Sequence, residues 1–298
     1  MWPPRFWGWL EQTVSPRRGL TLAGENDEKQ VKGLASKGSD PFTDSAKVKP
    51  MKTVVIIQAR VGSTRLPRKV LLRLGDQTVL GRIVDRMRAC KRVDEVVVAT
   101  THESADDAII EECQRCRVRV VRGSEHDVLA RYHHAALVSR ATDVIRITAD
   151  CPLIDPQLAD QLIAQYRVHR NNVPPVDYIS NTRPRSYPHG LDMEMFSMEA
   201  LEVAHREATA AYEREHVTPY FYQHPERFHL ENIVQQVDQS ALRWTLDEPT
   251  DFVFFQAVFR HFGGTDFVTT AEVLKLLDQH PHLQRINAAV KQKKLRAA

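Results

Sequence analysis

The hydrophobic positions of this sequence follow two alternating periods from Lys52 onward. Short continuous runs of β-branched residues predict strands buried on both faces at residues 53–58, 95–100, 118–122 and 143–148. Between these runs, apolar residues recur three and four positions apart. That spacing predicts helices at residues 80–87, 104–115 and 127–140, and another that begins at Asp155-Pro156.

The order of these elements indicates the fold class. Strands that alternate with helices of about 10–15 residues are typical of a three-layer α/β fold with a doubly wound, mostly parallel sheet. Residues 178–196 carry few helix signals, so we expect loops and a small antiparallel excursion there. Beyond them we expect helices at 197–211, 215–222, 250–261, 269–279 and 282–291, and a short strand at 243–246.

Polar residues at the predicted helix starts support this assignment. Ser104 and Asp155 are candidate N-caps, and Pro156 fits the first helical position. Thr269 and Glu272 have the spacing of a capping box.

The first 50 residues show little sustained period. Gly, Pro, Ser, Asp and Lys dominate from Gly19 onward, a composition that buries too little apolar surface to offset chain entropy. We expect a disordered or non-native extension over residues 1–50 and one folded domain over residues 51–298, with Met51 as the native start. The alternative is a sticky or membrane-surface segment built on the aromatic residues near the start, Trp2, Phe6, Trp7 and Trp9.

The charge balance is close to neutral. The 298 residues include 41 Lys and Arg and 38 Asp and Glu, a formal net charge of +3. Residues 1–50 hold eight of the basic and six of the acidic side chains, which leaves 33 and 32 for the rest. So small a charge argues against a nucleic-acid partner, and any positive cluster in the body is local.

Two further features limit the class of protein. The longest apolar runs are far shorter than the ~20 residues of a membrane span. Four cysteines are too few for a disulfide scaffold, so we expect a reducing, cytoplasmic setting. Cys113 and Cys116 have C-x-x-C spacing without a second pair, which favours core packing over a zinc or redox site.

A basic loop follows the first predicted strand. Residues 60–73 contain five positive charges and no acid, at the carboxyl end of a strand where open α/β sheets bind ligands. Gly62 and Ser63 permit a tight turn, and Arg and Lys suit phosphate oxygens. The loop has neither a Walker A nor a G-x-G-x-x-G pattern, and a solvated basic loop is the alternative.

Two aspartates follow other predicted strands. Asp150 lies just beyond residues 143–148, and Asp247 just beyond 243–246. One or two carboxylates can hold Mg²⁺, which neutralises the charge of bound phosphate groups. The alternatives are a turn residue for Asp150 and a helix N-cap before Pro249 for Asp247.

The sequence resembles a known family at these positions. Residues 57–69 are similar to the signature of the sugar-acid cytidylyltransferases, which include the 3-deoxy-manno-octulosonate and acylneuraminate enzymes. They are more similar to the spore-coat polysaccharide biosynthesis cytidylyltransferases, whose signature reads roughly I-Q-A-R-x-G-S-x-R-L-P-G-K. The resemblance extends over residues 52–255. Arg68, Ala149 and Glu248 depart from the usual Gly, Gly and Thr.

The resemblance implies a nucleotide-diphosphosugar-transferase-like fold and roles for the loop. Arg60, Arg65 and Lys69 are implied to hold the triphosphate of CTP, and Asp150 and Asp247 to bind Mg²⁺. Arg60, Lys69 and Asp150 are the expected catalytic residues. The remaining expected nucleotide contacts are Gln58, Ala59, Gly62, Ser63, Thr100, Thr101 and Asp127. For Asp127, ordinary capping of the next helix is an equally good interpretation.

Later segments resemble the walls of the family's acceptor pocket. They supply Arg183, Arg185, Tyr187, His189, Asp192, Glu194, Arg214 and His216. Arg183, Arg185 and Arg214 suit a substrate carboxylate, although a helix-surface ion pair is the alternative for Arg214.

The resulting hypothesis is a Mg²⁺-dependent cytidylyltransferase. It would transfer CMP from CTP to a sugar acid and release pyrophosphate, in the synthesis of a surface polysaccharide or glycan. A homodimer is expected because relatives commonly form dimers. The alternatives are a glycosyltransferase of related fold that uses a nucleotide sugar, and a non-catalytic nucleotide- or partner-binding module.

Overall fold

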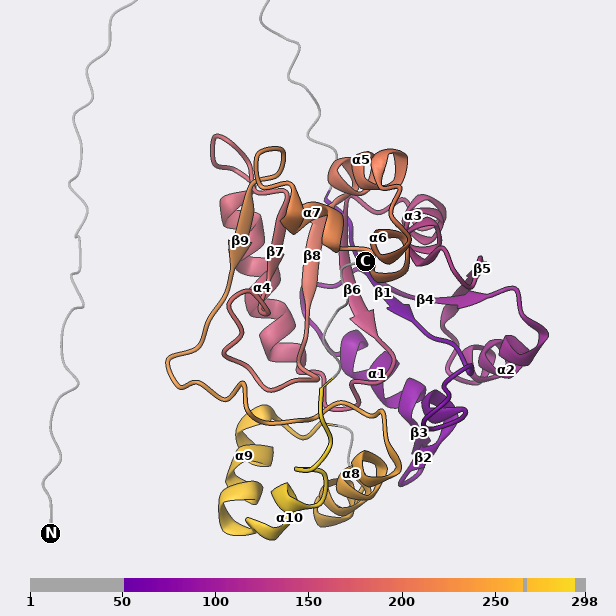
Figure 1. Ribbon diagram of the computed structural model, residues 1–298, viewed down its shortest axis with the longest axis vertical. Helices are drawn as coiled ribbons and strands as arrows, with labels where there is room; N and C mark the ends of the chain where they lie inside the picture. The colour runs from indigo at the N-terminus through magenta and orange to yellow at the C-terminus, as the bar shows by residue number, and fades with distance from the viewer. Residues whose placement is uncertain (1–50, 265–266, 293–298) are drawn as a thin grey trace, which may run out of the picture. The chain divides into compact units, whose positions relative to one another are not determined.

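The computed structural model describes residues 51–264 and 267–292. The predicted N-terminal extension therefore lies outside the described residues. Within them, one seven-stranded sheet runs in the order β5-β4-β1-β6-β8-β7-β9 (Figure 1). Its strands are β1 (Thr53–Gln58), β4 (Glu95–Thr101), β5 (Arg119–Gly123), β6 (Asp143–Thr148), β7 (Tyr178–Ser180), β8 (Glu194–Ser197) and β9 (Leu230–Asn232).

The sheet is mostly parallel, which confirms the predicted fold class. β1 pairs in parallel with β4 and β6, and β4 with β5. β8 is antiparallel to both β6 and β7, so the expected excursion is a two-strand extension of the main sheet. β9, parallel to β7, was not predicted, because its three residues carry no distinct pattern.

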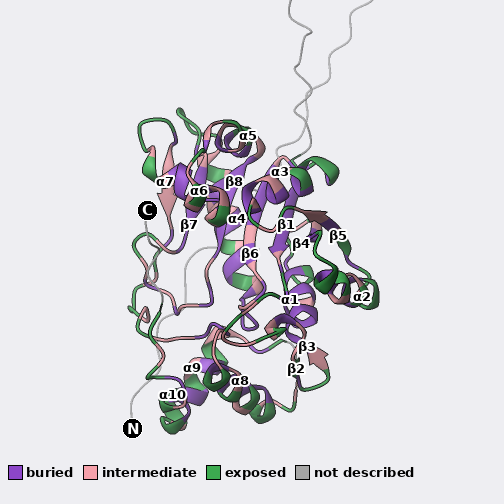
Figure 2. Ribbon diagram, turned by 45° about the vertical axis from the view of Figure 1, so that its right-hand side comes forward, coloured by how far each residue is buried: buried purple, intermediate pink, exposed green. Residues whose placement is uncertain are grey.

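Helices cover both faces of the sheet. Alternate residues of β1 belong to two separate cores: Val55 and Ile57 face one layer, Val54 and Ile56 the other. Figure 2 shows the central strands as the buried middle layer. The first layer comprises α1 (Val79–Arg88), α2 (Asp107–Arg115), α4 (Pro156–His169), α8 (Pro249–His261), α9 (Thr270–Gln279) and α10 (His282–Arg285). The second comprises α3 (Val128–Val138), α5 (Met198–Glu207), α6 (Ala211–His216) and α7 (Pro219–Gln223).

The helix caps follow the sequence prediction with one exception. Asp155 and Thr269 accept bonds from the first turns of α4 and α9, and Glu272 completes the box at α9. Ser104 is not an N-cap, because it lies in a 3₁₀ turn (Ser104–Asp106) that precedes α2. Asp106 is buried there and accepts the N–H of Val61, so this turn fixes the loop after β1.

Four other predicted elements differ from the structure. The helix expected at 215–222 is divided between α6 and α7, because Val217 has a φ of 71° and Pro219 starts a new helix. Residues 243–246 form only a single bridge, between Arg243 and His189. The last helix ends at Arg285, and α5 ends at Glu207. A short hairpin of β2 (Arg73–Leu74) and β3 (Gln77–Thr78) was not predicted.

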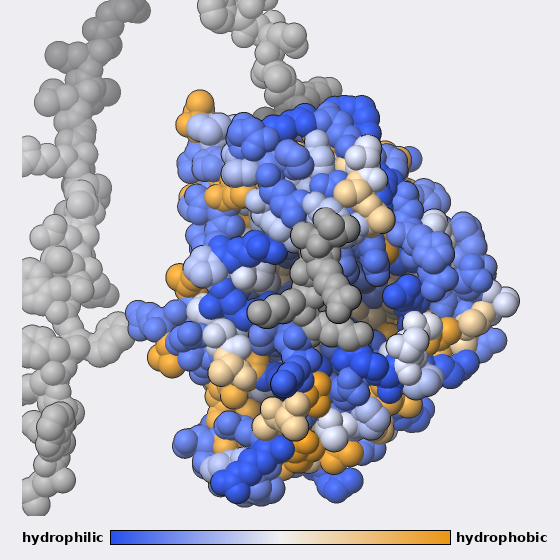
Figure 3. Space-filling view, in the orientation of Figure 1, coloured by the Kyte–Doolittle hydropathy of each residue, from blue (hydrophilic) through white to orange (hydrophobic). Residues whose placement is uncertain are grey.

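The surface is mainly polar on the face seen in Figure 3. Apolar atoms occur there in small groups between hydrophilic ones. No helix in the described part of the chain is both long and apolar enough to cross a membrane.

Candidate active site

The basic loop and both aspartates meet at the carboxyl ends of two adjacent strands. Gln58 and Thr148 are the last residues of β1 and β6 and are register partners. The N–H of Leu246 donates to the carbonyl of Asp150 at 2.8 Å, which brings Asp247 beside Asp150. A pocket of about 340 Å³ opens here. It is lined by Gln58, Ala59, Arg60, Gly62, Ser63, Thr64, Arg65, Lys69, Val70, Thr148, Ala149, Asp150 and Asp247.

A lysine ammonium lies between the two aspartates. Lys69 Nζ is 2.9 Å from Asp150 Oδ2 and 2.8 Å from Asp247 Oδ1. Burial alone would lower the pKa of Lys69, but the two carboxylates raise it above its ordinary value. Burial alone would raise the pKa of Asp150, but Lys69 and hydrogen bonds from nearby side chains hold it at about 2. Lys69 and Asp150 are therefore both charged at neutral pH.

The two arginines of the loop also contact carboxylates. Arg65 lies 3.3 Å from Asp247 Oδ1 and 2.9 Å from Glu248 Oε1. Arg60 Nη1 lies 3.3 Å from Glu125 Oε1. Arg60, Arg68 and Arg73 are exposed, so part of the loop is solvated, whereas Arg65 and Lys69 pair with acids at the pocket.

The carboxylate pair fits a divalent cation. A positive group already occupies the space between Asp150 and Asp247, at hydrogen-bond distance from both. Among the described residues no group of three or more His, Cys, Asp or Glu side chains is assembled for a metal. One or two carboxylates are nevertheless the protein ligands that Mg²⁺ usually has in such sites, and phosphate and water supply its other ligands.

A second pocket, of about 200 Å³, shares Gln58, Ala59 and Arg60 with the first. Gln58 Oε1 and Arg131 Nε are buried and have no partner among the described residues. Thr100 and Thr101 lie within the sheet, where the Thr101 hydroxyl donates to Asp106. Asp127 caps α3 and accepts two bonds from Arg214, at 2.6 and 3.0 Å. The predicted contacts of Thr100, Thr101 and Asp127 with the nucleotide stay predictions.

A third pocket, of about 290 Å³, contains most of the predicted acceptor residues. It is lined by Arg146, Thr182, Arg183, Arg185, Asp192, Glu194, His216, Thr218 and Tyr222. The terminal nitrogens of Arg185, Nη1 and Nη2, donate to the Asp192 carboxylate oxygens Oδ1 and Oδ2 at 2.5 and 2.7 Å. The Arg183 guanidinium lies 3.4 Å above the Tyr222 ring, and no carboxylate in the described residues pairs with it.

Three other residues predicted for the acceptor pocket have different surroundings. Tyr187 packs against the larger core. His189 is held by backbone bonds to Leu242 and Trp244. Arg214 pairs with Asp127, 87 positions away, and not with an acid at i,i+4 on its own helix. Its contact with a substrate carboxylate stays a prediction.

Comparison with known proteins decides the family. The cytidylyltransferase family matches residues 54–285. This chain is a member of the cytidylyltransferase family. It is similar to the spore coat polysaccharide biosynthesis protein SpsF of Bacillus subtilis, with 32% identity over 76% of this chain and 94% of the relative.

Solved structures agree with this family. A cytidylyltransferase from Leptospira borgpetersenii has a TM-score of 0.75 and 30% identity, and the match covers 82% of this chain and 100% of that one. A CMP:2-keto-3-deoxy-manno-octonic acid synthetase complexed with CTP shares the fold, with a TM-score of 0.55 and 17% identity over 71% and 99%. Membership makes this chain a CTP-using nucleotidyltransferase.

Arg68 shows what the departure from the family signature does to the loop. The resemblance implies that Gly is usual at this position, and Arg68 has a φ of 56°, in the left-handed region that favours glycine. Arg68 therefore adopts, in this cytidylyltransferase, a backbone conformation that is less favourable for a residue with a side chain than for glycine.

Sequence reasoning missed Arg146, which lines the third pocket. Its Nη1 lies 2.6 Å from Glu194 Oε2, and its Nε has no partner among the described residues. Glu194 also accepts the Tyr178 hydroxyl at 2.6 Å. The signal in the sequence was an arginine between the two isoleucines of β6. A charged side chain at such a position needs a polar partner.

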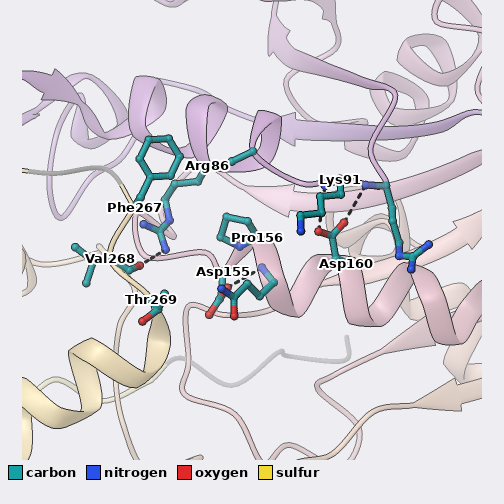
Figure 4. Close-up of a pocket in the computed structure, with 11 residues that line it drawn as sticks. Arg86, Lys91, Asp155, Pro156, Asp160, Phe267, Val268 and Thr269 are labelled. Atoms are coloured by element: carbon teal, nitrogen blue, oxygen red, sulfur yellow. Dashed lines mark hydrogen bonds between the residues drawn. The ribbon is translucent and has the colours of Figure 1, made fainter. Parts of the chain in front are cut away.

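A larger pocket, of about 640 Å³, lies apart from the cytidylyltransferase motifs (Figure 4). It lies between α1, α4 and residues 267–269. Arg86 on its wall donates to the carbonyls of Ile154 and Val268, and Asp160 accepts the N–H groups of Lys91 and Arg92. These bonds link neighbouring segments of the chain, so the polar groups of the wall have structural roles.

The cysteines support the interpretation as core packing. Cys113 is buried, and burial raises its pKa to about 12 and that of Cys116 to about 11. Neither is a thiolate at neutral pH, the form that metal binding or redox exchange requires.

Proposed function

We propose that this cytidylyltransferase transfers CMP from CTP to a sugar acid in a Mg²⁺-dependent reaction. The observation that carries the proposal is the Lys69 ammonium between Asp150 and Asp247, at the end of a loop that also presents Arg60 and Arg65. The same set offers two carboxylates for a cation and three cations for a triphosphate.

In this reaction the acceptor hydroxyl attacks the α-phosphorus of CTP. A P–O bond forms to the acceptor, the bond to the β-phosphate oxygen breaks, and pyrophosphate and one proton are released. Mg²⁺, when bound, would neutralise charge on the triphosphate and the leaving pyrophosphate. Asp150 and Asp247 would hold it.

The side chains of this site would exchange partners when CTP and the cation bind. Lys69 and Arg65 contact the carboxylates that the cation would take, at 2.8–3.3 Å. Released from them, both can turn to the phosphate oxygens, together with Arg60. Their work is positioning and stabilisation of negative charge, the main protein contribution in phosphoryl transfer.

The third pocket would hold the acceptor. Asp192 neutralises Arg185 and Asp127 neutralises Arg214, which leaves Arg183 as the predicted arginine without a carboxylate. Arg146 also lines this pocket, but its Nη1 is already paired with Glu194 Oε2 at 2.6 Å. We propose that the acceptor carboxylate lies against Arg183, as the acid named for the octulosonate relatives suggests.

The test is pyrophosphate release from CTP with a panel of ulosonic acids, with and without Mg²⁺. We expect release with at least one acid, only when Mg²⁺ is present, and more than tenfold faster than with the carboxamide of the same acid. Sugar transfer from a nucleotide sugar, without release from CTP, would contradict the proposal.

A further inference from the structure

One buried carboxylate holds the turn that carries Asp247. The Asp251 side chain, in the first turn of α8, is 0% exposed. Its Oδ2 accepts the N–H groups of Asp247 and Glu248, each at 2.9 Å. Two more bonds come from Arg243, whose Nε and Nη2 lie 3.0 and 2.9 Å from Oδ1 and Oδ2. The backbone before α8 is thereby fixed from inside the protein.

A fifth donor comes from the C-terminal segment. Asn287 Nδ2 lies 2.9 Å from Asp251 Oδ1, and the same amide donates to the Arg243 carbonyl at 3.2 Å. Asn287 is 3% exposed and lies just beyond α10, where the sequence predicted a longer helix. Ending that helix early lets the amide reach the turn.

Arg243 connects this cluster to Asp247. Its Nη2 lies 3.2 Å from Asp247 Oδ2 as well as 2.9 Å from Asp251 Oδ2. Asp251 therefore accepts two N–H donors of a guanidinium that also contacts Asp247, while Nη1 of the same guanidinium donates to Gln292. Asp247 Oδ1 faces Lys69 on the opposite side.

We propose that Asp251 and Asn287 are positioning residues for Asp247, and that the segment after α10 is thereby part of the CTP site. The inference rests on the proposed function, because that proposal assigns a cation to Asp247. Both residues act through the backbone and through Arg243.

The competing explanation is that Asp251 only caps α8. The chain contains a matched case in Glu272, which occupies the same third position of the neighbouring helix α9. Its Oε2 accepts the N–H and the hydroxyl of Thr269, at 2.8 and 2.7 Å. Glu272 therefore serves as a cap without contact to Asp247, and its variant separates capping from positioning.

The experiment compares the full-length variants Asp251→Asn, Asn287→Ala, Glu272→Gln and Asp247→Asn. Isothermal titration measures the affinity for Mg²⁺·CTP, and denaturant unfolding measures stability. We expect affinity to fall about 10–100-fold in Asp251→Asn and several-fold in Asn287→Ala, as for residues that orient metal ligands. Glu272→Gln should lower stability without changing the affinity.

The outcomes separate the two proposals. If Asp247→Asn binds Mg²⁺·CTP as the wild type does, the cation assignment fails, and the positioning inference fails with it. If Asp247→Asn binds weakly while Asp251→Asn and Asn287→Ala bind as Glu272→Gln does, only the positioning inference is overturned. If Asp251→Asn does not fold, Asn287→Ala alone decides, because it leaves Asp251 with four of its five donors.

Discussion

Asp150 is a carboxylate whose charge is stabilised by Lys69 within a half-buried site. A pKa of about 2, against an ordinary 3.8, corresponds to about 2 kcal/mol of stabilisation at neutral pH. We expect Asp150→Asn to lower the free energy of unfolding by no more than that. It should lower Mg²⁺-dependent turnover by roughly 100-fold or more, because a cation ligand is worth several kcal/mol in the transition state.

Asp160→Asn is the control for this variant. Asp160 accepts two backbone N–H groups outside the site, so its loss should reduce stability and leave turnover unchanged. Equal losses of stability and turnover in Asp150→Asn, measured by unfolding and pyrophosphate release, would contradict the cation role.

Arg68 permits a second test at the scale of one residue. The left-handed conformation costs a non-glycine residue about 1–2 kcal/mol, and the flexibility of glycine in the unfolded chain offsets about 0.5–1 of it. We expect Arg68→Gly to unfold at the same or higher denaturant concentration, with stability raised by up to about 1 kcal/mol. Arg73→Gly, at an ordinary strand position of the same loop, should be destabilised. If Arg68→Gly unfolds at a lower denaturant concentration than the wild type, the claim that the backbone at Arg68 is strained is contradicted.

The sequence predicted part of the charged centre from its strand ends, because Arg60 and Asp150 lie two positions beyond β1 and β6. Lys69 and Asp247 reach the same pocket from a 3₁₀ turn and a loop, and the family resemblance predicted them. The ion-pair partners of Arg60 and Arg65 were not predictable, because Glu125 and Glu248 come from loops whose course depends on packing. Arg146 was missed because its partner Glu194 is 48 positions away. Asp251 was missed although Arg243 is eight positions away, because nothing in the sequence shows that its carboxylate is buried and that Asn287, 36 positions away, contacts it.

At the scale of elements, the main-sheet strands and the helices of residues 52–170 follow the hydrophobic period closely. β1, β4 and β6 are covered on both faces, so burial and sequence pattern agree there. The agreement weakens after Tyr178, where short strands are held by partners distant in sequence. Residues 243–246 have the pattern of a strand but only one bridging partner, because the neighbouring segment turns at Gly190, with a φ of 101°.

The contact between α3 and α5 predicts a pH dependence. His133 and His205 stack with ring centroids 4.1 Å apart, and burial and the positive charges near them lower both pKa values from 6.5. The folded state thus favours the neutral rings. Their contribution to stability is present above about pH 6.5 and is lost as the pH falls through the lowered pKa values.

We therefore expect the free energy of unfolding to fall between pH 7 and pH 5. His133→Phe retains a stacking ring and removes a proton-binding site, so its fall should be smaller. His126→Gln, on an exposed loop, is the control. Denaturant unfolding at several pH values measures the slopes, and equal slopes for wild type and His133→Phe would contradict the role of the stack.

At the scale of the whole molecule, the family matches residues 54–285. The described residues 51–264 and 267–292 contain both cores and the four pockets described above. We propose that residues 51–298 are the nucleotidyltransferase domain. A chain that begins at Met51 should keep its melting temperature within about 2 °C and its affinity for Mg²⁺·CTP within about twofold. Loss of either would show that residues 1–50 are required.

The central claim is that CTP and a divalent cation bind where Lys69, Asp150 and Asp247 meet. Anomalous diffraction from a crystal grown with Mn²⁺ and CTP tests it most directly. We expect an anomalous peak in contact with both carboxylates and with phosphate oxygens, and Lys69 turned from the aspartates toward the triphosphate. A peak elsewhere, or Lys69 still between the two aspartates with CTP bound, would contradict the account.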